Sequence, residues 1–238
     1  RGGVKGVQAR LMQKSNENAV ENGVAVGFGF PNRTGYIIGK RLFNHKDLIK
    51  IEVLFKRLSW RSALKRRVKW RFLVNFAGWI SSLVIRFFLA IKGKSVSRVK
   101  YTWVSTFDES INLFWEKVKD QYTIMVQRDF VYLNWRYCRK PDNTYHILQA
   151  ELDGSIVGLV IVKYEDYKDA RIGFIMESLA IKDSMVVDSL LKRGLMFLSR
   201  NKVDVELASV SSSDPVKRAF YKKKKKKKED VWNSNIVY

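Results

Sequence analysis

Residues 145–164 read YHILQAELDGSIVGLVIVKY, two strand-like runs on either side of a turn. Apolar residues dominate both runs, 145–152 and 155–164, and Asp153-Gly154 between them is a strong signal for a two-residue β-hairpin. An isolated hairpin is marginal in water and needs further strands or a covering helix. The segment therefore predicts an antiparallel hairpin inside a larger sheet.

The elements around this hairpin indicate how the sheet continues. We expect a third strand at 171–181 and a fourth at 203–210. Val187, Leu190, Leu191, Gly194 and Leu198 mark one face of a helix between them, and a further helix should begin at Asp214-Pro215. A helix upstream of the hairpin has Ile111, Phe114, Trp115 and Val118 on one face. An antiparallel meander that leads into a strand–helix–strand crossover is an α/β (α+β) design.

The beginning of the chain has a similar but shorter order of elements. Residues 7–21 have a helical pattern that Gly23 ends. The apolar run VAVGFGF, 24–30, predicts a short buried strand. A short helix to about Leu42 and a strand over 48–58 complete the series. This order resembles the last half of the later part, so we expect one partial and one complete copy of a single unit.

We divide the chain into three parts: residues 1–58, the C-terminal half of a first unit; residues 59–104, a basic and apolar connector helix; and residues 105–238, a second, degenerate unit with a lysine-rich tail. The connector is mostly apolar over 72–91, about the length that spans a bilayer. Asn75 and Arg86 interrupt it, and charges within hydrocarbon are costly. Three interpretations of this segment stay open: a helix packed on the domains, a helix lying in a membrane interface, and a helix that spans the membrane.

Composition limits the classes of function. The single cysteine, Cys138, excludes a disulfide framework, and the distant His45 and His146 make no metal-ligand pattern, so we expect no metal. The net charge of +22 is local: Lys222–Lys228 are consecutive, and 61–100 contains no acidic residue. We expect a cytoplasmic protein and no nucleic-acid partner, with 61–100 as a candidate contact to an anionic membrane surface.

Three short motifs stand in the chain: GFPN at Gly29–Asn32, YLNWRY at Tyr132–Tyr137 and a glycine-rich start, RGGVKG, before the first helix. With the order of elements, they resemble the GNAT (GCN5-related N-acetyltransferase) superfamily, and the whole chain resembles a twin-GNAT protein. The resemblance implies a mixed, mainly antiparallel sheet flanked by helices. It also implies a chain truncated at its N-terminus, because the opening strands of the first copy are missing.

The resemblance implies acetyl transfer from acetyl-CoA, as cosubstrate, to an amine of a small molecule or amino sugar. The family binds the diphosphate of acetyl-CoA at such a glycine turn. Backbone N–H groups at a helix start attract anions in any case. The candidate cofactor-binding residues are Arg1, Gly2, Gly3, Lys5, Gly6, Val7 and Asn32, the last of which could instead cap the following helix.

The resemblance also suggests catalytic residues in the second copy. Residues 214–221, DPVKRAFY, match the family's last helix, with Tyr221 placed to protonate the departing thiolate. Glu177, in the third strand, is the candidate base for the amine proton. For both residues the alternative is an ordinary structural side chain.

Several alternatives remain beside acyl transfer. The corresponding turn of the second copy, 181–186, lacks glycine and contains Asp183, which would repel a diphosphate. Two rival functions remain. The chain is either a non-catalytic binding or scaffold protein of the same fold, or a basic protein that associates with the membrane surface. The interleaved YLNWRY could stack on bases, but packing is the favoured interpretation. Residues 222–238 are either a polybasic tail or an out-of-frame end.

Overall fold

Asp153 and Gly154 form the predicted turn in the computed structural model, with φ of 49° and 78°. Both values lie in the left-handed region that a type I′ hairpin turn requires. The structure describes residues 6–29, 31–47, 52–59, 75–81, 83–84, 98–122, 125–141, 144–168, 170–181 and 184–210. They fall into two units that divide between Ile51 and Glu52.

The first unit contains the two predicted helices, α1 (Val7–Glu21) and α2 (Arg33–Leu42). Gly23, with φ of 69°, ends α1, and its N–H donates to the carbonyl of Val20 at 3.0 Å. Asn32 caps α2, because its Oδ1 accepts from the N–H of Gly35 at 2.8 Å. Most of the described α1 side chains are exposed.

The predicted strand at 24–30 is wrong for the part that the structure describes. Residues 24–29 have no regular structure, and Val24, Val26 and Phe28 are exposed. A strand needs a neighbour to accept and donate its backbone hydrogen bonds. The described residues of the first unit include no other strand that could supply these bonds.

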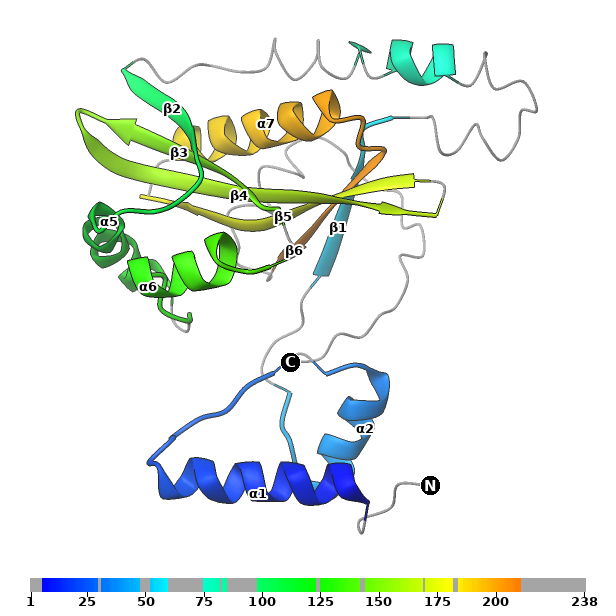
Figure 1. The fold of residues 1–238 in the computed structure, drawn as a ribbon, viewed down its shortest axis with the longest axis vertical. Coiled ribbons are helices and arrows are strands. Elements are labelled where there is room, and N and C mark those ends of the chain that lie inside the picture. The colour runs from blue at the N-terminus through cyan, green and yellow to red at the C-terminus, as the bar shows by residue number, and fades with distance from the viewer. Residues whose placement is uncertain are drawn as a thin grey trace. The chain divides into compact units, whose positions relative to one another are not determined.

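The second unit is built on a six-stranded sheet in the order β1-β6-β5-β4-β3-β2 (Figure 1). Its strands are β1 (Glu52–Arg57), β2 (Val99–Val104), β3 (His146–Leu152), β4 (Ser155–Tyr167), β5 (Ala170–Ala180) and β6 (Val205–Val210). β5 and β6 are parallel, and every other neighbouring pair is antiparallel. The predicted mixed, mainly antiparallel sheet is therefore confirmed.

β1 belongs to this sheet, although the sequence analysis assigned its residues to the first unit. It pairs antiparallel with β6 from Glu52 opposite Val210 to Arg57 opposite Val205. Directly after it, Leu58 is fully buried, and its N–H donates to the carbonyl of Asp204 at 2.8 Å. This pairing satisfies the backbone groups on the facing edges of β1 and β6, which a separate placement of β1 would leave open.

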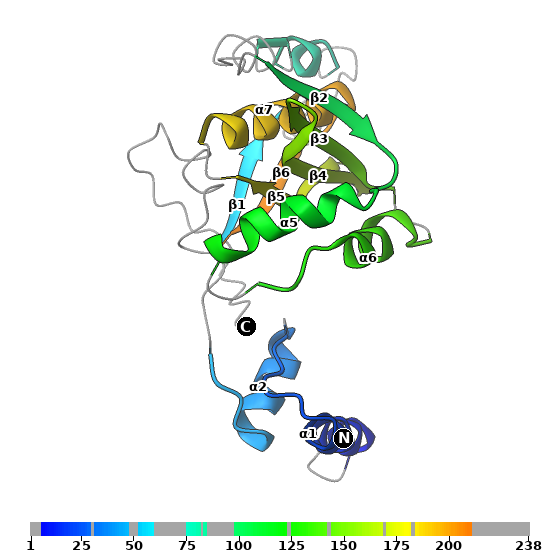
Figure 2. The ribbon, with the colours of Figure 1, turned by 90° about the vertical axis from the view of Figure 1, so that its left-hand side faces the viewer.

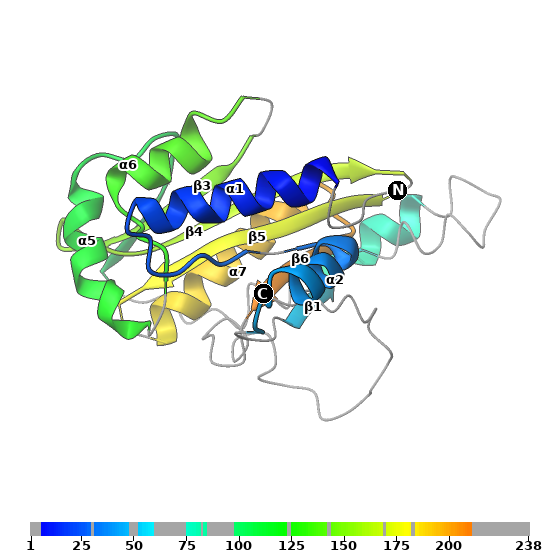
Figure 3. The ribbon, with the colours of Figure 1, turned by 90° about the horizontal axis from the view of Figure 1, so that it is seen from below.

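Helices cover both faces of the sheet (Figure 2). α7 (Ser184–Arg200) lies on one face, where Leu190 and Leu198 pack with Leu148, Val160 and Val162 of β3 and β4. Figure 3 shows α7 running along β4 and β5 behind the sheet. On the other face lie α5 (Ser110–Val118) and α6 (Phe130–Leu133). The predicted stripe of α5 is confirmed, since Ile111, Phe114, Trp115 and Val118 are all buried.

Several predicted segments have little or no described structure. In the connector, residues 75–81 and 83–84 are helical. Within the described residues, no helix has the length and apolar character needed to cross a bilayer. The helix expected from Asp214 and the tail 222–238 lie outside the described residues.

Candidate active site

A bulge in β5 places Glu177 on the α5 and α6 face of the sheet. Ile161 of β4 lies opposite Glu177, whereas the next residue, Val162, lies opposite Ile175, so Met176 is the extra residue. An extra residue breaks the strict alternation of faces along a strand. Ile175 accordingly packs with the α7-side cluster, while Leu179, four residues on, is buried on the opposite face. Without the bulge, the Glu177 carboxylate would point into the apolar core beneath α7.

Two polar side chains donate hydrogen bonds to the Glu177 carboxylate on that face. Arg128 Nε donates to Glu177 Oε1 at 2.9 Å, and the Tyr137 hydroxyl donates to the same oxygen at 2.8 Å. The side chains of Arg128 and Glu177 are 14% and 9% exposed, so the ion pair is largely shielded from water. Among the described residues, no hydrogen bond uses Oε2 of Glu177, which leaves this atom to accept a proton.

Arg128 is held in position from several sides. Its Nη1 donates to the carbonyl of Val126 at 2.8 Å, and its guanidinium lies 4.9 Å from the ring centroid of Tyr132. Arginine suits this position because its planar group can hydrogen-bond at one edge while it stacks on an aromatic face. The Glu177 carboxylate is therefore paired with a guanidinium group whose position is fixed.

Tyr137 comes from a π-helical turn, η2 (Asn134–Cys138), that directly continues α6. Asn134, at the start of this turn, is buried and bonded through both ends of its amide. Its Oδ1 accepts from the N–H of Phe107 at 3.1 Å, and its Nδ2 donates to the carbonyls of Phe107 and Phe130 at 3.1 and 3.0 Å. The motif YLNWRY thus packs with an apolar and hydrogen-bonded core, which supports packing as the role of Leu133, Asn134 and Tyr137.

Burial changes the acidity of both partners. It raises the pKa of Glu177, whereas the charge of Arg128 and the hydrogen bond from Tyr137 act in the opposite direction. The pKa of Tyr137 is also raised, first by burial and then by the neighbouring Glu177 carboxylate. Glu177 is therefore a stronger proton acceptor than an exposed carboxylate, and Tyr137 stays protonated.

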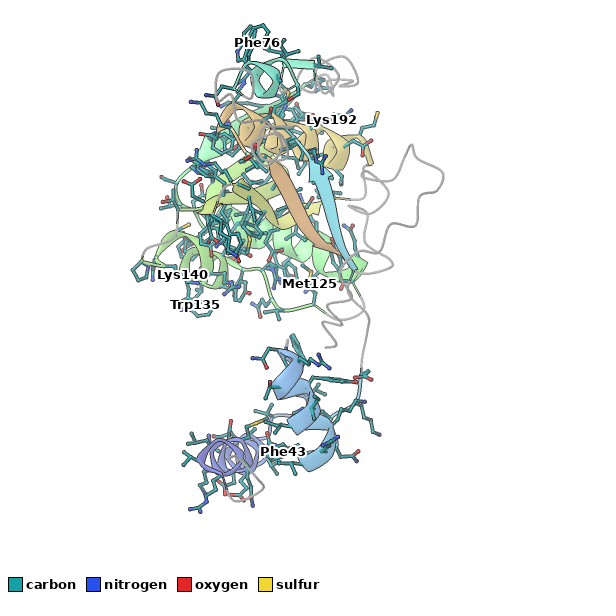
Figure 4. All side chains as sticks on the ribbon, turned by 90° about the vertical axis from the view of Figure 1, so that its right-hand side faces the viewer. Phe43, Phe76, Met125, Trp135, Lys140 and Lys192 are labelled. Carbon is teal, nitrogen blue, oxygen red and sulfur yellow. The ribbon has the colours of Figure 1, made fainter. Side chains whose placement is uncertain are left out.

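A shallow hollow of about 330 Å³ adjoins this group of residues. Tyr132, which stacks on Arg128, is part of its wall, so Arg128 connects the hollow to Glu177. Trp135 projects into solvent at this surface and is 61% exposed (Figure 4). The lining residues are Val126, Gln127, Asp129, Val131, Tyr132 and Trp135.

The described pairing of the parallel strands β5 and β6 ends close to Glu177. Their described ladder runs from Ile172 opposite Val205 to Ile175 opposite Ala208. β5 continues to Ala180 and β6 to Val210, and among the described residues no pair beyond Ile175 and Ala208 joins the two strands. Glu177 lies two residues beyond the last paired residue of β5, and α7 follows β5 directly.

The predicted cofactor-binding residues lie in the first unit and are described only in part. Gly6 is the N-cap of α1, with φ of −70° and ψ of 153°, and no side chain caps this helix start. Val7 is the first helical residue and is exposed, and Asn32 caps α2. Arg1, Gly2, Gly3 and Lys5 lie outside the described residues, as does Tyr221.

Sequence reasoning identified Glu177 but missed both of its partners. Arg128 is 49 residues away from Glu177 in the chain, and Tyr137 is 40 residues away. No local pattern connects these positions. Tyr137 did lie within the quoted motif, and a polar residue inside an apolar strand, as Glu177 is, signals that a partner must exist. Within the described residues, no group of three or more His, Cys, Asp or Glu could hold a metal ion.

A mixed sheet covered by α7 on one face and by α5 and α6 on the other is a fold that this chain shares with solved structures described as acetyltransferases of the GNAT type. Solved structures of this class match the chain, whereas no protein-family model and no curated protein matches it. A conserved Enterococcus faecalis V583 protein of unknown function, described as a probable N-acyltransferase, is 13% identical over 90% of this chain and 45% of its own, with a TM-score of 0.50.

A GCN5-related N-acetyltransferase from Anabaena variabilis ATCC 29413 is 13% identical over 89% of this chain and 46% of its own, also with a TM-score of 0.50. This chain thus spans less than half the length of these two structures. An aminoglycoside acetyltransferase from an uncultured soil sample, solved with sisomicin, is 12% identical over 56% of this chain and 93% of its own, with a TM-score of 0.42. At such identities the likeness is one of fold.

Proposed function

We propose that this chain is an acyl-CoA-dependent N-acyltransferase that transfers an acetyl group from acetyl-CoA to the amine of a small molecule or amino sugar. The observation that carries the proposal is the bulge at Met176, which turns a shielded carboxylate toward the face covered by α5 and α6, two residues beyond the last described pair of the parallel strands. The GNAT-type fold supports the same reaction class. The proposal includes a twin-GNAT arrangement with a partial first copy and a catalytic second copy.

The chemistry proposed for Glu177 is general-base catalysis. The amine nitrogen attacks the thioester carbonyl carbon, and the proton that the nitrogen loses passes to Glu177. The C–S bond then breaks, and Tyr221 gives its proton to the departing thiolate. The raised pKa of Glu177 favours this role, because a more basic carboxylate holds the amine proton better.

The start of α1 is the proposed site for the diphosphate of acetyl-CoA. Gly6 brings no side chain to the N-cap, and the first turn contains no acidic residue, so the backbone N–H groups of the turn face no competing carboxylate. In this proposal Arg1 and Lys5 add positive charge, and Gly2, Gly3 and Val7 contribute backbone. Asn32 is not needed, because its side-chain oxygen already caps α2.

The opening between β5 and β6 favours a second position for the donor. Among the described residues, those beyond Ile175 and Ala208 do not pair with each other, so their facing backbone groups can accept an extended ligand. The pantetheine arm of acetyl-CoA has two amide groups that match such an edge. This position lies in the same unit as Glu177, and the diphosphate of acetyl-CoA would meet the start of α7, where the preceding Asp183 would weaken its binding.

The hollow beside Arg128 supports an amine acceptor with a ring. Trp135 and Tyr132 offer aromatic faces, which pack against the C–H groups of sugar rings. Asp129 offers a carboxylate, which attracts an ammonium group. An amino sugar carries both features.

Calorimetric titration with acetyl-CoA tests the proposal and separates the two donor positions. The matched variants are Val7→Asp and Met185→Asp, since each adds a carboxylate to the exposed first turn of one helix. Such a charge is favourable for the helix itself, so both proteins should fold. Repulsion of the diphosphate should weaken the affinity for acetyl-CoA by about tenfold, or about 1.4 kcal/mol. If the donor binds at α1, this loss should appear in Val7→Asp. If the donor binds at α7, it should appear in Met185→Asp.

Binding that neither variant weakens would overturn both positions. An unaltered protein that binds no acetyl-CoA at millimolar concentration would overturn the enzymatic proposal and favour the scaffold function.

A further inference from the structure

The connector contains a helix whose apolar face is turned to solvent. Helical positions 76, 79, 80, 83 and 84 follow the i, i+3, i+4, i+7 spacing of one face. Large apolar side chains occupy all five, and their exposed fractions lie between 37% and 53%: Phe76, Trp79, Ile80, Leu83 and Val84. In a helix packed on a protein core, such a stripe would be buried.

The opposite face of the same helix is small and less exposed. Gly78 is buried, and Ala77 and Ser81 are half-buried. The Ser81 hydroxyl donates to the carbonyl of Gly78 at 2.9 Å. The usual arrangement is therefore reversed, with small residues inward and large apolar ones outward. Figure 4 shows Phe76 projecting from this helix.

The sequence around the helix is strongly basic. Residues 61–100 contain eleven Lys and Arg and no Asp or Glu. In the sequence, Arg71 precedes Asn75 by four residues and Arg86 follows Val84 by two. An apolar stripe between clusters of cations is complementary to a surface with anionic groups above an apolar layer.

We infer that the helix at 75–84 lies in the interface of an anionic lipid bilayer, with Phe76, Trp79, Ile80, Leu83 and Val84 inserted below the headgroups. The cations of 61–100 contact the lipid phosphates. Trp79 suits this depth, because its ring is apolar and its N–H can bond to the headgroup region. A second copy of the chain is a poorer occupant, since eleven cations on each copy would repel one another. The inference concerns a surface separate from the proposed acyl-transfer site.

Vesicle flotation of the full chain tests this inference. The protein should float with vesicles of phosphatidylcholine and phosphatidylglycerol, and at least about tenfold less should float with phosphatidylcholine alone. Raising NaCl to about 0.5 M should release most of it, because salt screens the cation–phosphate contacts. The variant Phe76→Ser/Trp79→Ser should lose flotation by a similar factor.

The matched control is Leu11→Ser/Val20→Ser, which removes two exposed apolar side chains from α1 and should float like the parent. A second variant, Arg66→Gln/Arg67→Gln, keeps the stripe and should float less with the anionic vesicles. Equal flotation of the parent on both vesicle types, or unchanged flotation of Phe76→Ser/Trp79→Ser, would overturn the inference. The inference would also be overturned if the parent bound no lipid and light scattering showed the parent to be a dimer and Phe76→Ser/Trp79→Ser to be a monomer.

Discussion

Arg128 Nε and Glu177 Oε1 lie 2.9 Å apart and join the segment before α6 to the centre of β5. Both side chains are largely buried, so each charge depends on the other for compensation. Arg128 also stacks on Tyr132, which lines the hollow together with Trp135. One ion pair thus has a structural role and defines the proposed site.

Removal of Arg128 alone should be costly. Arg128→Ala leaves a shielded carboxylate without its cation, which should lower the free energy of unfolding by about 3 kcal/mol. Glu177→Gln should cost less, because its neutral amide oxygen still accepts the hydrogen bond from Tyr137. The double variant should be more stable than the sum of the two single changes predicts. Urea denaturation of all four proteins gives the coupling energy.

The matched control for that cycle is the surface pair of Arg98 and Asp153, whose side chains are 72% and 63% exposed. Arg98→Ala should cost less than about 1 kcal/mol, because water replaces the lost contact. Additive effects of Arg128→Ala and Glu177→Gln would show that the two side chains do not interact as described.

The raised pKa of Glu177 predicts a specific dependence of stability on pH. The folded protein holds the Glu177 proton more tightly than the unfolded chain does. Its contribution to stability is fully present below the ordinary pKa of a glutamate and is lost as pH rises through the higher folded pKa. The unfolding free energy of Glu177→Gln minus that of the parent should therefore increase from about pH 4 to about pH 8.

Denaturation at several pH values measures this difference, and Glu109→Gln, at an exposed position, is the control for introducing a neutral amide. If the difference in unfolding free energy between Glu177→Gln and the parent falls as pH rises, Arg128 and Tyr137 lower the pKa of Glu177 by more than burial raises it.

Among the polar side chains of the YLNWRY motif, Asn134 should contribute most to the stability of the fold. Asn134→Ala removes three hydrogen bonds and leaves the backbone groups of Phe107 unsatisfied, at a cost of about 2–3 kcal/mol. Asn112→Ala is the control: this exposed side chain accepts one bond, from the N–H of Phe130 at 2.8 Å, and should cost about 1 kcal/mol or less. Thermal or urea denaturation compares the two, and equal costs would contradict the buried role of Asn134.

Gly158 should be required for the contact between β4 and α7. A Cβ at this position would lie 2.8 Å from Leu190 Cδ1 and 3.1 Å from the carbonyl oxygen of Leu179. Gly158→Ala should therefore destabilise the protein by about 1–3 kcal/mol through overpacking. Gly27→Ala, where a Cβ meets no atom within 4 Å, should change stability by less than about 0.5 kcal/mol. The prediction fails if both variants unfold at the same urea concentration as the parent.

Local patterns predicted those elements of the fold that are stabilised locally. The Asp153-Gly154 turn and the apolar stripe of α5 are encoded within a few residues, and both are confirmed. The run at 24–30 shows the limit of this approach, because an apolar segment becomes a strand only where another strand pairs with it. β1 shows the same point in reverse, since its partner β6 lies about 150 residues further along the chain.

The candidate site could be predicted only in part. Glu177 stood out as a carboxylate within an apolar strand, but the bulge at Met176 that sets its direction leaves no sequence signal. Arg128 is one cation among many in a basic chain, so nothing local singles it out. The proposed roles of Arg1, Gly2, Gly3, Lys5 and Tyr221 rest on the family resemblance and stay predictions.

The most direct test of N-acyl transfer is the release of free CoA thiol from acetyl-CoA in the presence of a panel of amino sugars. The account predicts release that depends on the amine and that falls by about 100-fold or more in a folded Glu177→Gln variant, because a general base contributes at least this factor. Release that no amine stimulates, or that Glu177→Gln leaves unchanged, would contradict it.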